Sequence, residues 1–230
     1  MRPCGTTGAV NRGAPFGHNP PVTLPLFDVV DPEPPLPPGL HLVHDWLSAA
    51  ESSELLGQID RQPWLPDLKR RVQHYGWKYD YTLRDLSPDQ YLGPIPPLFS
   101  PVVDRLAAVP QFGAKAEQII VNEYLPGQGI AAHIDRDTFG DVVASVSLGS
   151  EWPMEFTSRS GETIEVFMPV GALLLMTGPS RHDWTHHIRP RKSDTRAGVR
   201  VARTRRVSLT FRTLGPQFSN LVGTRNSAGD

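Results

Sequence analysis

The chain has 230 residues, of which 39% are hydrophobic and 20% charged, with a formal net charge of −1. This is enough apolar material for one buried core, and no apolar run is long enough to cross a bilayer. The one cysteine, Cys4, excludes a disulfide framework, and the N-terminus lacks the apolar segment of a secretory signal. We therefore expect a soluble, cytoplasmic protein without membrane partners, and a monomer as the default state.

The N-terminal extension, residues 1–39, is rich in proline and glycine and contains the run PEPPLPP at 32–38. Proline removes backbone donors and resists regular structure. We expect this extension to be largely disordered.

Two helices are predicted before residue 118. Ser48 and Glu51 have the spacing of a capping box. The apolar stripe that follows consists of Leu55, Leu56 and Ile59. The segment SPVVDRLAAV at 100–109 predicts a second helix, with Ser100 as its N-cap and a proline in its first turn. Between the two helices lies an aromatic and basic segment, residues 64–84.

From residue 118 onward the hydrophobic period changes to two. Seven short runs separated by turn residues predict strands: QIIVNEYL, VVASVSLG, PMEFTS, TIEVFMP, ALLLMTG, DWTHHI and RRVSLTFRT. Short strands at this spacing favour a closed or sandwiched β fold over a parallel βαβ sheet. The predicted fold class is mainly β, with N-terminal helices covering one outer face.

Alternation along a strand predicts which side chains share a face. Asn122 and Tyr124 point the same way, and so do His133 and Asp135 if that piece is extended. In the last predicted strand, one face carries Arg206, Ser208, Thr210 and Arg212, and the other carries Val207, Leu209 and Phe211. The apolar face is expected to pack on the helices. Two arginines inside a barrel need counter-charges, which predicts an anionic ligand such as a dicarboxylate.

The His133-x-Asp135 pair suggests a metal centre, which needs a third ligand. His182, His186 and His187 are the candidates. Two histidines and one carboxylate form the facial triad of non-haem Fe(II) oxygenases. On a strand, His186 faces the same way as Trp184, whereas His187 faces the opposite way. Each motif alone is weak, since a surface histidine–aspartate pair is common, and His187 stays open as the alternative.

The order of these motifs resembles the AlkB-type Fe(II)/2-oxoglutarate-dependent dioxygenases. The resemblance is carried by RRVQHYGWKYDY, NEYLPGQGIAAHID, LLLMTGPSRHDWTHHI and RRVSLTFR. It implies a double-stranded β-helix, or jelly-roll, core with a nucleotide-recognition lid. It covers residues 40–214 as one dioxygenase domain and leaves residues 215–230 as a flexible tail.

The same resemblance implies site residues by position. It assigns the catalytic iron ligands to His133, Asp135 and His186. It assigns cofactor binding to Asn122, Tyr124, Arg206, Ser208 and Arg212, with Ser208 standing where some members have an asparagine. It implies Fe(II), 2-oxoglutarate and O2 as cofactors. The implied reaction couples 2-oxoglutarate decarboxylation, to succinate and carbon dioxide, to oxidative removal of an N-alkyl group as an aldehyde.

Alkylated nucleic acid, DNA or RNA, is the expected partner. The candidate substrate-binding residues are Trp64, Arg71, Tyr75, Trp77 and Asp137. Aromatic rings could stack on an extruded base and the basic residues could contact phosphates, or the segment could be a packed aromatic hairpin with a solvated charge patch. Asp137 could accept a hydrogen bond from an exocyclic amine or only anchor its loop.

Two questions stay open in the sequence. The basic run 189–206 fits a phosphate backbone or a solvated loop. The alternatives to nucleic-acid demethylation are an oxygenase of the same type that acts on a protein or small molecule, and a catalytically silent nucleic-acid-binding jelly roll.

Overall fold

The computed structural model describes residues 35–66, 69–80, 86 and 88–216. The predicted disorder of residues 1–34 and the predicted tail beyond 216 lie outside the described residues. The predicted lid lies only partly within them. In the part of the chain that is described, no helix has the length and apolar character needed to cross a membrane.

Two of the three described helices lie before residue 118, and most of the strands follow them in the chain. The helices are α1 (Ala49–Asp60), α2 (Ser100–Ala107) and α3 (Gly178–His182), with 3₁₀ turns at Pro88–Gln90 and Pro97–Phe99. The strands are β1 (Leu40–Val43), β2 (Val72–Tyr75), β3 (Gln118–Tyr124), β4 (Ile130–His133), β5 (Phe139–Leu148), β6 (Trp152–Thr157), β7 (Thr163–Met168), β8 (Leu173–Met176), β9 (Thr185–Ile188), β10 (Ser193–Arg196), β11 (Val199–Ala202) and β12 (Arg206–Leu214).

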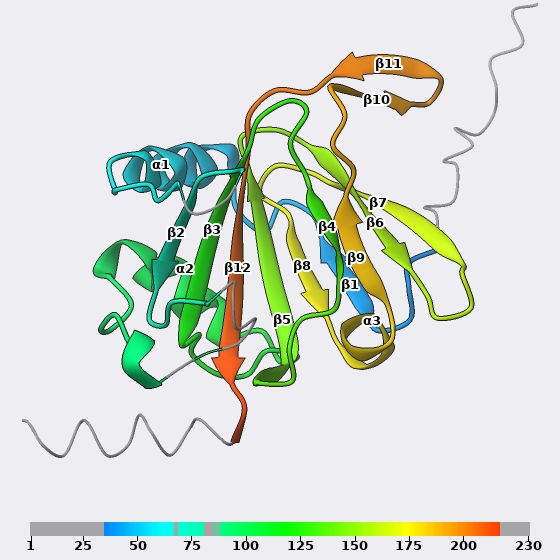
Figure 1. Cartoon of the computed structure of the whole chain (residues 1–230). Coiled ribbons are helices and arrows are strands. Elements are labelled where there is room, and N and C mark those ends of the chain that lie inside the picture. Colours follow the sequence, from blue (N-terminus) through cyan, green and yellow to red (C-terminus); the bar gives the residue numbers. More distant parts are fainter. Residues whose placement is uncertain (1–34, 67–68, 81–85, 87, 217–230) are drawn as a thin grey trace, which may run out of the picture. The chain divides into compact units, whose positions relative to one another are not determined.

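Two antiparallel sheets form the jelly-roll core (Figure 1). The larger sheet has the order β1-β8-β5-β12-β3-β2, and the smaller has the order β4-β9-β6-β7. Residues from both sheets share one buried cluster, in which Tyr124 and Leu174 of the larger sheet meet Trp152 and Phe156 of the smaller one. The predicted mainly β, jelly-roll fold is confirmed.

Helices α1 and α2 cover the other face of the larger sheet. The apolar face of β12 enters the same buried cluster as Ile59 of α1 and Leu106 of α2. The residues of β12 that do so are Val207, Leu209 and Phe211. The predicted division of β12 into a helix-facing and an inward-facing side is therefore confirmed, and it fixes which side chains can reach the space between the sheets.

One helix start is confirmed and the other is wrong by one residue. The Ser48 hydroxyl accepts a hydrogen bond from Glu51 N at 3.2 Å, and Ser48 N donates to Glu51 Oε2 at 2.7 Å, which closes the predicted capping box. Ser100, however, is the first helical residue, and Phe99 takes the N-cap position. The 3₁₀ turn at Pro97–Phe99 runs directly into α2, so the chain is already helical at Ser100.

Several elements were not predicted. α3 separates two of the predicted strands, and the basic run folds partly into the hairpin β10–β11. Ala197 and Gly198 both have positive φ at its tip, which suits a two-residue hairpin turn. Figure 1 shows this hairpin standing away from the two sheets. β10 is polar, and the two valines of β11, Val199 and Val201, are exposed, so this hairpin lacks the buried apolar face by which the other strands were predicted.

Candidate active site

His133 and His186 are brought together by the pairing of β4 with β9. The two residues are direct partners in the antiparallel register, and their ring centroids lie 4.3 Å apart. Gly129 permits this pairing, because a Cβ there would lie 2.2 Å from the Ile188 carbonyl oxygen. Backbone contact that close leaves room only for glycine. The histidine pair is thus a consequence of strand register.

Asp135 lies just after the end of β4 and is buried, with 7% of its surface exposed. Its Oδ2 lies 3.7 Å from His186 Nε2 and has no hydrogen-bond partner among the described residues. Its Oδ1 accepts a hydrogen bond from Arg212 Nη2 at 2.5 Å. Burial alone would raise the pKa of Asp135, but the charges of Arg212, His186 and His133 lower it below its usual range. The carboxylate is therefore ionised, with one oxygen held and the other free.

His133 is oriented by its own strand. Its Nδ1 lies 2.8 Å from the Ala131 carbonyl oxygen, so Nδ1 is the donor and Nε2 is left as the acceptor that a metal requires. Among the described residues, no three histidine, cysteine or carboxylate side chains are already arranged to hold a metal ion. The three predicted ligands do line one cavity.

His187 is committed elsewhere. Its Nε2 lies 2.8 Å from Glu155 Oε1, which also pairs with Arg189. His186 is 7% exposed, and burial, followed by the nearby charge of His133, lowers its pKa to about 3. A neutral imidazole is the form that binds a metal. Of the two histidines, only His186 lines the cavity, so the assignment of the third iron ligand to His186 stays the prediction that this geometry favours.

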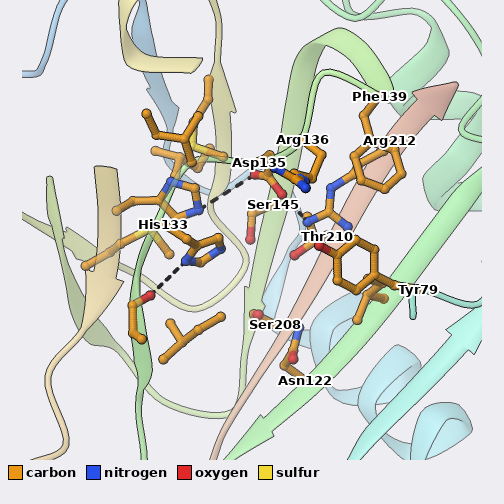
Figure 2. Close-up of a pocket in the computed structure, with 18 of the residues that line it drawn as sticks. Tyr79, Asn122, His133, Asp135, Arg136, Phe139, Ser145, Ser208, Thr210 and Arg212 are labelled. Carbon is orange, nitrogen blue, oxygen red and sulfur yellow. Dashed lines mark hydrogen bonds and ion pairs between the residues drawn. The ribbon is translucent and has the colours of Figure 1, made fainter. Parts of the chain in front are cut away.

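A cavity of about 570 Å³ opens beside these side chains (Figure 2). It is lined by both triad histidines and Asp135, and by side chains of β3, β5, β8 and β12. The predicted residues on its wall are Asn122, Tyr124, His133, Asp135, His186, Ser208 and Arg212. Residues at distant positions in the sequence thus meet in one cavity of the size that usually holds a small ligand.

The sequence model described as 2OG-Fe(II) oxygenase superfamily matches residues 39–212. The chain belongs to this superfamily. It is 39% identical over 169 residues to the Mus musculus tRNA (carboxymethyluridine(34)-5-O)-methyltransferase ALKBH8, covering 70% of this chain and 26% of that protein. It is 33% identical over 200 residues to the Arabidopsis thaliana alkylated DNA repair protein ALKBH8 homolog, covering 76% and 58%.

The chain therefore spans about a quarter of the mouse relative and somewhat more than half of the Arabidopsis one. Among solved structures, OsALKBH1 matches with a TM-score of 0.58 at 21% identity, covering 78% of this chain and all of that one. The AlkB-type assignment is thus confirmed. This 2OG-Fe(II) oxygenase is a dioxygenase whose cofactors are Fe(II), 2-oxoglutarate and O2.

The donor set of the dioxygenase fits its metal. The two histidines and Asp135 provide the nitrogen and oxygen ligands of a facial triad, which leaves open positions for other ligands. The buried and unbonded Oδ2 of Asp135 is the specific observation, because an ionised oxygen without a partner is costly inside a protein. When bound there, Fe(II) would supply the redox chemistry that activates O2.

Arg206 differs from its predicted place. It is fully buried and is not part of the cavity wall; its guanidinium carbon lies 5.5 Å from the Tyr124 ring centroid. Its Nη2 donates to Ser147 Oγ at 2.8 Å, but Nε and Nη1 have no partner among the described residues. Burial lowers the pKa of Arg206 to about 10. Two unbonded donors on a buried cation would suit a carboxylate, so the contact of Arg206 with 2-oxoglutarate stays a prediction.

Arg212 has a second task beyond the predicted cofactor contact. Besides its bond to Asp135, its Nη1 donates to Gln118 Oε1 at 3.0 Å, and its guanidinium lies 4.7 Å from the Phe139 ring centroid. Its Nε has no partner among the described residues and remains available to an anion. Arg212 therefore holds the metal-binding carboxylate in place from the cavity side.

Arg181 was missed by the sequence reasoning. It is 2% exposed, and its Nη1 and Nη2 donate to the main-chain oxygens of Asp135 and Arg136 at 2.8 and 2.7 Å. Asp135 lies beyond the end of β4, where the main chain makes no strand-to-strand hydrogen bonds within the described part of the chain. The two bonds from Arg181 hold the main chain there instead. An arginine in the middle of LLLMTGPSRHDWTHHI was the available signal, but no spacing rule predicts its target.

None of the five predicted substrate-binding residues lines the iron cavity. Trp77 is 2% exposed and packs against Tyr91, and Tyr75 packs edge-on against Phe99. Trp64 and Arg71 line a second cavity. For Tyr75 and Trp77 the expectation of stacking on a base is therefore not supported, because their rings are used in packing.

Asp137, the fifth, is 93% exposed at its side chain and lies 3.8 Å from His182 Nδ1. It is not part of the cavity wall. Its two predicted roles stay predictions. The segment 69–80 instead supplies Arg70 and Tyr79 to the cavity wall. Both belong to the aromatic and basic segment that the sequence indicated, but alternation along an irregular segment could not select them.

The basic run 189–206 is largely neutralised within the protein. Arg189 pairs with Glu155, Arg191 with Glu165 and Asp194, and Arg196 with Glu151. Arg203 binds Asp194 through two nitrogens, at 2.6 and 2.8 Å. These pairs fasten the hairpin to the smaller sheet. Neither predicted interpretation of this run, a phosphate contact or a solvated loop, describes these arginines, because their charges are used in ion pairs within the protein.

Proposed function

We propose that this dioxygenase removes alkyl groups oxidatively from N-alkylated bases of DNA or RNA. The reaction consumes 2-oxoglutarate and O2 and gives succinate, carbon dioxide, an aldehyde and the unmodified base. The observation that carries the proposal is the composition of the cavity that the predicted iron ligands line. Its lining also includes the aromatic ring of Tyr79 and the cations Arg70 and Arg136.

An aromatic ring can stack on an extruded base, and cations can bind the flanking phosphates. Among the described residues that line the cavity, three carry a positive charge (Arg70, Arg136 and Arg212) and one carries a carboxylate (Asp135). Iron and 2-oxoglutarate carry opposite charges of equal size, so the loaded cavity stays positive. The name of the mouse relative refers to tRNA and that of the Arabidopsis relative refers to DNA, which supports a nucleic-acid substrate.

The side chains of the chain have separate tasks in this proposal. His133, Asp135 and His186 bind the iron, and Arg212 keeps the carboxylate oriented. Arg206 and Tyr124 bind the distal end of the keto acid, and Asn122 and Ser208 line the space between. Phe139 and Met154, which also line the cavity, limit the access of water. A bound base would thus be held beside the metal in a largely apolar space.

The test is 2-oxoglutarate turnover with and without single-stranded DNA or RNA carrying one N-methylated base. We expect succinate and formaldehyde to form in equal amounts only with a methylated oligonucleotide, and the restored base to appear by mass spectrometry. Succinate formation that no oligonucleotide stimulates would point to a protein or small-molecule substrate. An Asp135→Ala variant serves as the control for background oxidation.

A further inference from the structure

A second cavity, of about 670 Å³, adjoins the iron cavity and shares Arg70 with it. Its charged lining residues are Asp60, Lys69, Arg70, Arg71, Glu123 and Arg205. Four cations therefore face two carboxylates. None of the predicted iron ligands lines this second cavity, so its excess positive charge among the described residues calls for a ligand of its own.

Hydrogen bonds show which cations are already balanced. Arg71 donates to Glu123 through Nε and Nη2, both at 2.6 Å. Arg205 donates to Glu123 through Nε at 2.7 Å and to Asp60 through Nη1 at 2.8 Å. These two arginines and two carboxylates form a closed network. The uncompensated charge is therefore carried by the remaining two cations, Lys69 and Arg70.

Lys69 and Arg70 are both available to a ligand. Lys69 is exposed, and its ammonium makes no ion pair with any described residue. Arg70 uses only Nε, which donates to Asn122 Oδ1 at 2.8 Å, so its terminal nitrogens have no partner in the described part of the chain. Its guanidinium also lies 5.5 Å from the Tyr124 ring centroid. Arg70 thus stands at the boundary between the iron cavity and the second cavity.

Trp64 is the aromatic residue of the second cavity, but a guanidinium already lies over it. Arg71 lies 4.9 Å and Arg205 6.0 Å from the Trp64 ring centroid. Cation–π contacts of this kind occupy a face on which a base would have to stack. The ligand that fits the remaining groups is therefore an anion and not a base.

We propose that the second cavity binds a phosphodiester of the strand whose modified base enters the iron cavity. The inference rests on the proposed function, since it assumes a nucleic-acid substrate. Arg70 lines both cavities, so a strand with one base beside the iron can place a neighbouring phosphate against Arg70 and Lys69. Recognition here is independent of base identity, because phosphate contacts carry no sequence information.

The test compares Lys69→Ala with Lys115→Ala, which removes an exposed lysine that pairs with Asp104 on α2. Binding of a fluorescent single-stranded oligonucleotide with one N-methylated base is measured by anisotropy over a range of salt concentrations. The full chain is used with Fe(II) and 2-oxoglutarate in the absence of O2. The KM values for this oligonucleotide and for the free N-methylated nucleoside are measured in parallel.

We expect Lys69→Ala to weaken oligonucleotide binding by about fivefold and to reduce the salt slope by about 0.7, the contribution of one phosphate on a single strand. The ratio of oligonucleotide KM to nucleoside KM should rise by a similar factor, whereas Lys115→Ala should keep the wild-type ratio and slope. Lys69→Glu should weaken binding further. An unchanged slope in Lys69→Ala, or an equal loss in Lys115→Ala, would overturn the phosphate site.

The proposed function has a separate readout in the same experiment. If the wild-type chain oxidises methylated oligonucleotides but Lys69→Ala binds them as tightly, the phosphate site alone is wrong. If the wild-type chain oxidises none of them, the demethylase proposal is wrong, and the phosphate site in the form proposed here is wrong with it.

Discussion

Arg181 holds the main chain of Asp135 through a hydrogen bond from Nη1 to the carbonyl oxygen, 2.8 Å long and bridging 46 positions of sequence. A second bond reaches the next carbonyl, that of Arg136. The side chain of Asp135 is held independently, by Arg212. Arg181 fixes the position of the Asp135 main chain, and Arg212 fixes the orientation of its carboxylate. The direction in which Oδ2 points is therefore restricted.

Replacing Arg181 should therefore weaken metal binding without touching a ligand. We expect Arg181→Gln to lower the affinity for Fe(II) or Co(II) by about 10- to 100-fold, the usual effect of removing a group that orients a ligand. Two carbonyls lose a buried partner, so the free energy of unfolding should fall by about 1–3 kcal/mol. Metal titration followed by Co(II) absorption, with urea unfolding, measures both. A metal affinity equal to wild type would contradict the positioning role.

The two neighbouring histidines should behave in opposite ways. His186→Ala should lose more than about 100-fold in metal affinity and abolish 2-oxoglutarate turnover, because it removes a ligand. His187→Ala removes the pair with Glu155 and should keep metal affinity within about threefold of wild type, because His187 does not line the iron cavity. If His187→Ala lost the metal and His186→Ala kept it, the assignment would be reversed.

Arg206→Met should show how the buried guanidinium affects the free energy of unfolding in the absence and in the presence of 2-oxoglutarate. Without 2-oxoglutarate, we expect unfolding free energies within about 1 kcal/mol of wild type, because the lost guanidinium carries two unbonded donors. With 2-oxoglutarate at about 100 times its Kd, wild type should gain about 2.7 kcal/mol and the variant should gain almost nothing. Thermal unfolding with and without the keto acid measures this difference.

Arg203→Met is the matched control, since Arg203 is also a buried arginine on the segment leading into β12. It pairs with Asp194 through two nitrogens, so its loss should destabilise the fold by about 3–5 kcal/mol. Its stabilisation by 2-oxoglutarate should remain that of wild type. A lost response in this variant would mean that the response reports general damage.

Glu123 predicts how stability depends on pH. The hydrogen bonds from Arg71, and then from Arg205, lower the pKa of Glu123 below its usual value, although burial opposes them. A carboxyl whose folded pKa is lowered contributes stability above the unfolded value, near pH ~4.3, and loses it as pH falls through the folded pKa. Glu123→Gln should cost about 1–3 kcal/mol at pH 7, because Arg71 and Arg205 lose a buried acceptor but are themselves partly exposed.

The difference in unfolding free energy between wild type and Glu123→Gln should decrease steadily below about pH 4. There, Glu123 of the wild type becomes protonated and is uncharged, as the glutamine of the variant is at every pH. Urea unfolding of both proteins at pH 7 and at pH 3 checks the sign. Glu54→Gln, an exposed carboxyl bonded only to Gln58, should show almost no difference at either pH. A larger difference in unfolding free energy between wild type and Glu123→Gln at pH 3 than at pH 7 would contradict the role of the Arg71–Glu123–Arg205 network.

The sequence by itself determined the strand pattern, the face of β12 that packs on the helices, and the identity of the residues that gather at the iron cavity. The face of a side chain is a local property, because alternation along a strand sets it. The residues expected at the cavity came from the order of the motifs, through the resemblance to a known family. The wrong N-cap at Ser100 is also local, since one preceding 3₁₀ turn shifted the start of α2.

Only the tertiary structure decided what each side chain touches. It placed His186 but not His187 on the cavity wall and packed Tyr75 and Trp77 against other rings. It also engaged the basic run in ion pairs and bonded Arg181 to the main chain at Asp135. The physical reason is that these contacts join segments tens of residues apart. Which donor meets which carbonyl there depends on sheet register and on chain that belongs to no regular element, and neither leaves a periodic trace in the sequence.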